Sequence, residues 1–192
     1  LSKVVVTTPN STFTWDAASG DTVSAISTSP NLVVLADLEN TFRAFIIDPT
    51  SSVWSYQTFG FWGTGAGTDS GTVGTFSEGL RTEGTAVPVV GSATFSGELL
   101  GYYIDGVGDD RFITSSVSLN ADFAARTLAF ESSGSSVIFQ DGRPNTAIAE
   151  LDMTGGLTYS SGDNSFGGTL SAPAASLTGT ASGVFYGPNA EE

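Results

Sequence analysis

The side chains that could do chemistry in this sequence are carboxylates, because neither histidine nor cysteine occurs among its 192 residues. Two carboxylates can hydrolyse a glycosidic bond when they face each other across a cleft. No spacing in the sequence pairs the candidates, so we favour an acidic surface over a catalytic site and predict that the chain is not an enzyme. The carboxylates considered are Asp16, Asp21, Glu98, Asp105 and Asp152.

Two glycine-rich stretches have the composition of ion-binding loops. Residues 105–110 place three carboxylates on glycine-rich backbone, which suits Ca²⁺, but the EF-hand spacing and its distal glutamate are missing. We therefore favour a solvated loop over a calcium site. Residues 63–67 have the glycines of a phosphate loop but neither its lysine nor a following helix, which favours a flexible hairpin loop. No cofactor is expected.

The composition excludes several classes of function. Without histidine there is no Ser-His-Asp catalysis and no histidine ligand for zinc or haem, and without cysteine there is no disulfide or thiolate site. A net charge of −14 repels phosphate, so we predict no nucleic-acid partner. No apolar run reaches transmembrane length, and the first residues do not read as a signal peptide. A lipid-bearing cysteine upstream of residue 1 stays open.

An aromatic segment at 54–62 is the best candidate for binding a partner. Aromatic residues occupy both phases of this predicted strand, so some face outward unless residues 1–53 cover them. Core packing is favoured, with a binding face as the alternative. The apolar start of the chain at residues 3–8 could also be donated as a strand to a neighbouring copy. The partner contacts predicted on these grounds are Val4, Val5, Val6, Trp54, Tyr56 and Trp62.

Short strands must position all of these residues. Apolar and polar residues alternate with period 2, most clearly where Val117, Leu119, Ala121 and Phe123 are separated by polar residues. Such strands recur about every ten residues between Gly, Asp and Ser, which is typical of a barrel or sandwich. No helical periodicity is present, so the class predicted is all-β. The predicted strands are 4–6, 13–15, 31–35, 41–47, 54–62, 93–103, 117–123, 126–130, 137–139, 157–159, 166–170 and 177–186.

Four segments, in this order, carry a family resemblance: YQTFGFW at 56–62, VPVVGSATFSG at 87–97, ADFAARTL at 121–128 and GVFYGPNAE at 183–191. Together they resemble the transferrin-binding-protein-like β-barrel domain of bacterial surface lipoproteins and secreted solute-binding proteins. The resemblance covers residues 54–192. It implies an eight-stranded antiparallel up-and-down barrel at 54–192, preceded by a small β-rich handle at 1–53.

The resemblance also implies a function. Members of that family bind host iron carriers, haem proteins or complement regulators through loops and outer faces of the barrel, and some bind haem directly. Their barrel has no catalytic site. We therefore expect a non-enzymatic binding protein, extracellular or on the outer membrane of a Gram-negative bacterium, whose partner is a protein or small solute.

The end of the sequence motivates an alternative. Strand 177–186 runs into the turn residues Gly187-Pro188-Asn189, whereas the family pattern continues into a last strand, so the closing strand is expected to be missing from this sequence. A barrel lacking one strand exposes two edges, and a strand from a second copy would complete it. In this alternative the protein is a self-assembling surface structure. A closing strand in the full gene product is the simpler explanation that stays open.

Overall fold

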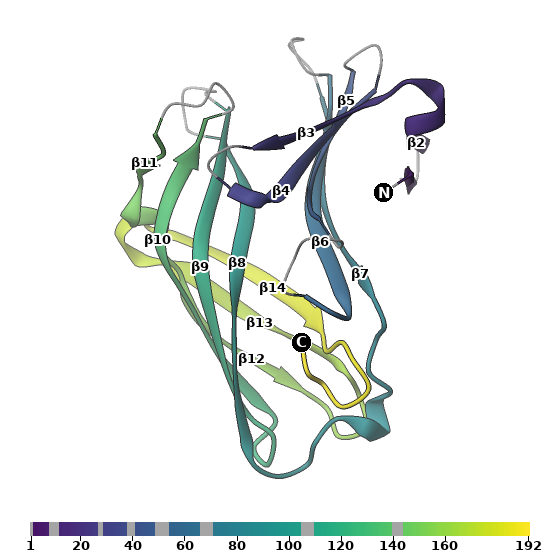
Figure 1. Ribbon diagram of the computed structural model, residues 1–192. Coiled ribbons are helices and arrows are strands. Elements are labelled where there is room, and N and C mark those ends of the chain that lie inside the picture. Colours follow the sequence, from purple (N-terminus) through teal and green to yellow (C-terminus); the bar gives the residue numbers. More distant parts are fainter. Residues whose placement is uncertain are drawn as a thin grey trace. The chain divides into compact units, whose positions relative to one another are not determined.

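The computed structural model describes residues 2–7, 12–26, 29–37, 41–48, 54–65, 71–104, 110–139 and 144–192. Within these ranges the chain consists of β-strands, connecting turns and four 3-10 turns, without an α-helix (Figure 1). The all-β class predicted from the sequence is confirmed. The described residues also contain no helix long and apolar enough to cross a membrane.

The chain divides into two compact units, Leu1–Glu78 and Gly79–Glu192, each with its own core. The domain boundary predicted after residue 53 stays a prediction. The segments that follow residue 53, β6 and β7, hydrogen-bond in the sheet of the first unit rather than in that of the second.

The first unit contains a two-stranded hairpin and a five-stranded sheet. The hairpin pairs β1 with β2, and the sheet has the order β3-β4-β5-β6-β7. The strands are β1 (Lys3–Thr7), β2 (Thr12–Asp16), β3 (Thr22–Ile26), β4 (Ser29–Ala36), β5 (Phe42–Ile47), β6 (Gln57–Thr64) and β7 (Val73–Gly79), with the 3-10 turn η1 (Ala17–Ser19) after β2.

The central strand β5 is buried on both of its faces. Its sequence is apolar at every position except Arg43, as expected for a strand covered on both sides. Phe42, Ala44 and Ile46 belong to one cluster with the hairpin. Phe45 and Ile47 alternate with them and are also buried.

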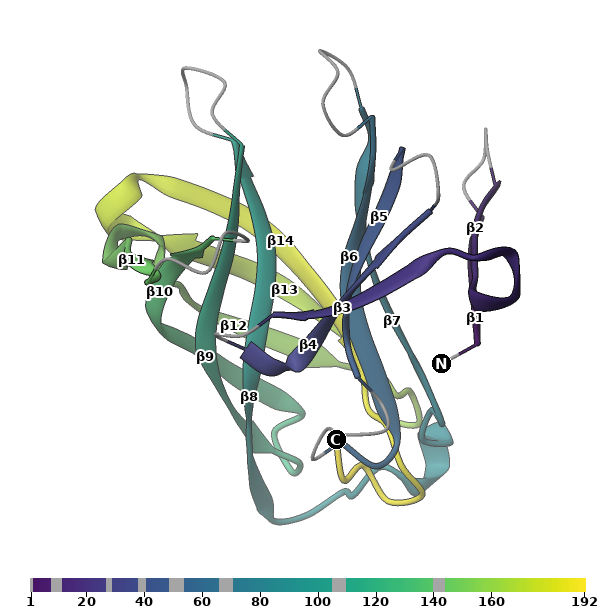
Figure 2. The same cartoon turned by 45° about the horizontal axis from the view of Figure 1, so that its top comes forward.

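The second unit is a single curled sheet with the order β14-β13-β12-β10-β9-β8, and β11 pairs beside β10 (Figures 1 and 2). Its outer strands among the described residues are β8 and β14, so this part of the chain forms a half-barrel. The strands are β8 (Ser92–Ile104), β9 (Asp110–Asp122), β10 (Thr127–Ile138), β11 (Thr146–Ala147), β12 (Thr154–Tyr159), β13 (Ser165–Ala172) and β14 (Leu177–Val184), with the 3-10 turns η2 (Gly84–Ala86), η3 (Ala149–Leu151) and η4 (Pro173–Ala175).

The core of the second unit gathers around the ring of Phe185. The centroid of that ring lies 5.1 Å from the ring of Phe166, 5.4 Å from Tyr159 and 6.2 Å from both Phe95 and Phe123. Three of the four segments that carry the family resemblance meet in this core. The buried residues of the cluster are Val87, Ala121, Phe123, Leu128, Leu157, Phe185 and Ala190.

The turn predicted after β14 is present. Gly187 and Ala190 both have positive φ, at 90° and 62°, a conformation that glycine adopts without steric cost. The backbone of Tyr186 and Glu192 exchanges two hydrogen bonds, of 2.6 and 3.1 Å, which close the turn. On its other side Tyr186 forms an antiparallel bridge with Arg81.

Candidate functional site

The β1–β2 hairpin provides one wall of the aromatic site in the first unit. Its register pairs Val4 with Trp15 and Val6 with Phe13, so these four side chains share one face of the hairpin. That face packs on the cluster formed by β4, β5 and β6. The hairpin therefore covers Trp62, one of the aromatic residues that the sequence alone left as candidates for a binding face.

Aromatic contacts hold this cover in place. The rings of Phe13 and Phe42 are stacked with centroids 5.6 Å apart, and the ring of Phe13 lies 5.8 Å from that of Trp62. Trp15 is fully buried, and its indole Nε1 donates a 2.9 Å hydrogen bond to the carbonyl oxygen of Thr22. This bond satisfies the only polar group of a side chain that is otherwise an apolar anchor.

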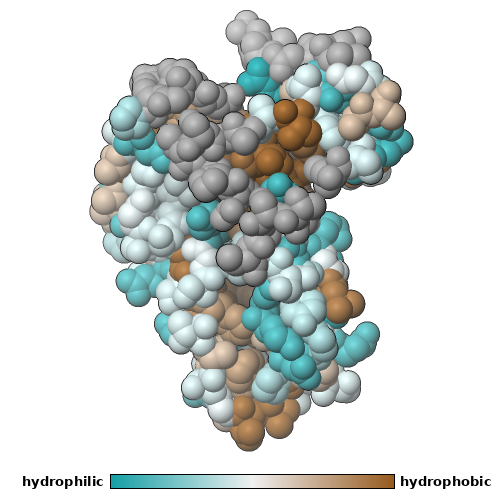
Figure 3. All heavy atoms as spheres, viewed as in Figure 1, coloured by the Kyte–Doolittle hydropathy of each residue, from teal (hydrophilic) through white to brown (hydrophobic). Residues whose placement is uncertain are grey.

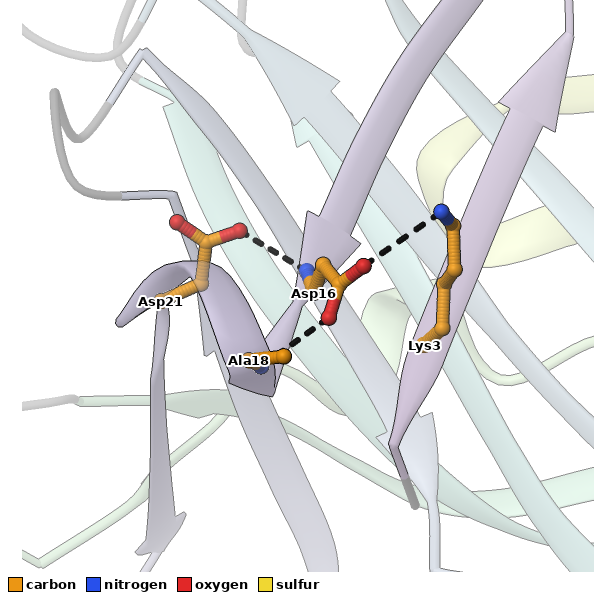
Figure 4. A network of polar contacts seen from close by, with 4 residues as sticks. All are labelled: Lys3, Asp16, Ala18 and Asp21. Atoms are coloured by element: carbon orange, nitrogen blue, oxygen red, sulfur yellow. Dashed lines mark hydrogen bonds and ion pairs between the residues drawn. The ribbon is translucent and has the colours of Figure 1, made fainter.

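A polar network shapes the turn between β2 and β3 (Figure 4). The Asp16 carboxylate accepts a 2.9 Å hydrogen bond from the amide of Ala18 and lies 3.3 Å from Lys3 Nζ. The Asp21 carboxylate in turn accepts a 2.8 Å hydrogen bond from the Asp16 amide. Gly20 closes the turn at φ 90°. Two carboxylates considered for catalysis thus bind backbone amides.

The structure separates the six residues predicted to contact a partner. Trp62 belongs to the cluster of buried residues that the hairpin covers, and it is only 6 % exposed. Val4 and Val6 pack against the same cluster. Val5 lies on the opposite face of the hairpin and is 52 % exposed. Trp54 is half-buried and meets Phe59 edge-on at 5.9 Å, and Tyr56 is half-buried. Their role as partner contacts stays a prediction.

The candidate donor strand is paired within its own chain. β1 pairs with β2 over five residue pairs, from Lys3 opposite Asp16 to Thr7 opposite Thr12. Donation of this strand to a second copy would require the hairpin to open or its second edge to be used. The packing described above has the hairpin closed within its own chain.

Two of the remaining candidate carboxylates, Asp152 and Glu98, lie on the second unit. Asp152 follows η3 and binds backbone amides of β10, and Glu98 is exposed on β8. Asp105 lies outside the described residues, as does most of the 105–110 loop and the end of the 63–67 loop. Among the described residues no group of three metal-ligating side chains comes together.

A buried serine cluster in the second unit escaped sequence reasoning. Ser115 on β9 and Ser135 on β10 are buried, with their hydroxyl oxygens 2.9 Å apart. The register of β10 against β9 shifts between Ser133 and Ser136, and the Asp152 carboxylate accepts the Ser135 amide at 2.8 Å. The run of serines and one glycine at 132–136 inside an apolar strand was the signal available in the sequence.

The charge of Asp152 is stabilised by this arrangement. Hydrogen bonds from the hydroxyl and the amide of Ser135 hold the pKa of the Asp152 carboxyl below its ordinary value of 3.8, and the Gly134 amide adds to the effect. An acidic group with a lowered pKa is a poor proton donor at neutral pH. The hydrogen bonds of Ser115, Ser135 and Asp152 thus connect β9, β10 and the segment after η3.

The geometry so far defines an all-β protein with a half-barrel and a separate sheet capped by a hairpin. No family model matches the chain, and no curated protein matches it. Among solved structures, the chain is similar to a single-residue mutant of the vaccine antigen transferrin-binding protein B from Haemophilus parasuis. The TM-score is 0.58 at 14 % sequence identity, and the match covers 97 % of this chain and 35 % of the other. The chain thus spans about a third of that protein's length and shares its fold.

Proposed function

We propose that this chain is a non-enzymatic bacterial binding protein that is either secreted or located at the cell surface. It holds a protein partner through the loops at the ends of its curled sheet. The observation that carries the proposal is the likeness in fold to transferrin-binding protein B over 97 % of the chain. The packing of three resemblance segments into one core supports it.

Transferrin is the first partner to test, because the similar protein is named for binding it. The purified chain is immobilised, and iron-loaded and iron-free transferrin are passed over it in an interferometry experiment. We expect saturable binding that the heat-denatured chain does not show. A parallel titration with haem, followed by absorbance, tests the small-solute alternative. If neither transferrin nor haem binds, the proposed ligand classes are wrong.

We further propose that the curled sheet is the larger part of an eight-stranded up-and-down barrel. The support is the curl of the six-strand path, together with the outer edges of β8 and β14. Among the described residues these edges pair with no further strand, and a β-protein normally covers such edges. Hydrogen exchange tests this. Some backbone amides of β8 and β14 do not donate hydrogen bonds to β9 or β13. In a closed barrel these amides bond to the closing strands and therefore exchange slowly. Rapid exchange at these amides would mean that the edges are free.

The surface location belongs to the same proposal, together with a lipid anchor upstream of residue 1. Protease treatment of intact cells that express the full gene product tests it. We expect the protein to be digested while a periplasmic marker survives. Survival of the protein until the cells are lysed would contradict a surface location.

A further inference from the structure

Four chain segments of the second unit meet at one end of the curled sheet. Ser92 at the start of β8 pairs with Asp122 at the end of β9, and Ser165 at the start of β13 pairs with Val184 at the end of β14. The segments that join or continue these strands therefore lie at the same end, which we call the loop end. They comprise residues 80–91, 123–126, 160–164 and 185–192.

The segment that leads into β8 is anchored at the loop end by the hydrogen bonds of Thr82. Thr82 is buried, and its hydroxyl donates a 2.7 Å hydrogen bond to the Gly187 carbonyl oxygen. Its amide donates to Phe185 O at 2.9 Å, and its carbonyl oxygen accepts from Asn164 Nδ2 at 2.6 Å. Val87 inserts into the core beside Phe185.

Two apolar side chains project from this anchored segment into solvent. Val89 and Val90 are 72 % and 74 % exposed, the highest values among the large hydrophobic residues that the structure describes. The Phe123 amide donates to the Gly91 carbonyl oxygen at 3.0 Å and fixes the far side of the loop. Figure 3 shows hydrophobic surface at this lower end of the molecule, where Figure 1 draws the segment that leads into β8.

Single exposed valines scattered over a surface need no explanation. Val89 and Val90 are adjacent and lie in an anchored loop, which suits them to binding. Binding normally costs the entropy of ordering loops at the interface. Here Val87, Thr82 and Gly91 already order the loop on both sides of the pair. The small apolar tip can therefore enter a recess of a partner without a folding step.

The charges around the loop end select the partner. The loop end carries four carboxylate side chains and two guanidinium groups. Hydrogen bonds from Ser165 and Asn189 also lower the pKa values of Asp163 and Glu191, which keeps both carboxylates charged. An anionic lipid surface is repelled, as is a second copy with the same rim.

Building on the proposed function, we propose that the loop end is a protein-docking surface, with Val89 and Val90 as its apolar contacts. The partner that it fits is a protein surface with an apolar recess bordered by lysine or arginine. This assignment differs from the partner contacts predicted from the sequence, all of which lie in the first unit.

The test uses the full chain and three synthetic peptides that alternate Lys with Leu, Lys with Ser, or Glu with Leu. Calorimetry measures their binding to the wild type, to Val89→Ser/Val90→Ser, and to the matched control Val23→Ser/Val73→Ser, which changes two exposed valines of the first unit. We expect the Lys–Leu peptide to bind best and to lose about tenfold in affinity in the loop-end variant alone. A Glu83→Lys variant reverses an exposed charge of the loop end and should also weaken binding of the Lys–Leu peptide.

Equal affinity of the Lys–Leu peptide for the wild type and the loop-end variant would overturn the assignment, as would no binding at all. Preferential binding of phosphatidylglycerol vesicles, or dimerisation lost in the loop-end variant, would replace the protein partner by a membrane or a second copy. The peptide result does not depend on transferrin. A failure of transferrin to bind therefore counts against the proposed function and not against this surface.

Discussion

Buried hydroxyl groups form hydrogen bonds that connect separate segments of this protein. Thr82 and the serine pair Ser115–Ser135 sit where strands end or change register, and each hydroxyl meets a defined partner. A buried polar group that loses its partner costs about 1–3 kcal/mol, more than the net worth of the bond itself. The loop end and the bulge in β10 are thus sensitive to small changes of side chain.

Substitution of Thr82 by valine tests the first of these sites. Thr82→Val keeps the side-chain shape but leaves the buried Gly187 carbonyl oxygen without the Thr82 hydroxyl. We expect the free energy of unfolding to fall by about 1–3 kcal/mol in urea titrations followed by circular dichroism. Thr85→Val, at an exposed position nearby, is the control and should change stability by less than about 0.5 kcal/mol. Equal stability of the two variants would contradict the assignment.

The pH dependence of stability tests the role of Asp152. Because its folded pKa lies below the ordinary 3.8, the carboxylate stabilises the fold above that pH, and the contribution is lost as pH falls through the folded value. Asp152→Asn should therefore be less stable than the wild type at neutral pH, and the difference should shrink in acid. Chemical unfolding at a series of pH values measures it, with Glu150→Gln as the exposed control. A difference that is constant with pH would mean that the charge is not involved.

At the scale of elements, glycines set how closely neighbouring strands approach. A Cβ at Gly168 on β13 would clash with the Gly156 carbonyl oxygen of β12, whereas a Cβ at Gly179 on β14 would meet nothing within 4 Å. Both glycines look alike in the sequence, as interruptions of a strand. The contact across the sheet distinguishes them.

Alanine substitutions should separate the two glycines. Gly168→Ala forces the backbones of β12 and β13 apart, so we expect a loss of about 1–3 kcal/mol in unfolding free energy. Gly179→Ala meets open space and restricts the unfolded chain, so it should be neutral or stabilise by up to about 1 kcal/mol. Thermal unfolding of the two variants in parallel makes the comparison. A stable Gly168→Ala protein would show that the strands can separate without cost.

The alternation of apolar and polar residues predicted most of the strands. It did not predict which strands pair with one another. β8 and the end of β9 follow the expected alternation, because one face of each strand is more buried than the other. β3, β7 and β11 were missed, and the strands predicted at 126–130 and 137–139 belong to the single strand β10. Residues 73–79 lie outside every predicted strand, yet they form β7 and pair with β6. Hydrogen bonds to a neighbouring strand overrode the weak local preference.

At the scale of the whole molecule, the two units differ in their fluorophores. All three tryptophans, Trp15, Trp54 and Trp62, precede Gly79. Tryptophan emission therefore reports the first unit, whereas circular dichroism reports the strands of both. Proteins built of separate units need not unfold in one step.

Two core truncations exploit this difference. Leu35→Ala and Leu128→Ala each remove a buried side chain, one from each core, at a cost of about 2–5 kcal/mol. We expect Leu35→Ala to shift the emission midpoint in urea, and Leu128→Ala to shift mainly the dichroism signal. Coincident shifts of both signals in both variants would show that the two units unfold as one.

The sequence by itself determined the all-β class, most strands and the lack of histidine and cysteine chemistry, because alternation and composition are local properties. It also marked the segments that form the second core. Only the tertiary structure decided that Trp62 is covered by the β1–β2 hairpin, that Asp16 and Asp21 bind backbone, and that Val89 and Val90 project from an anchored loop. Which face of a strand meets which neighbour depends on register between distant segments, and a period-2 pattern does not encode that register.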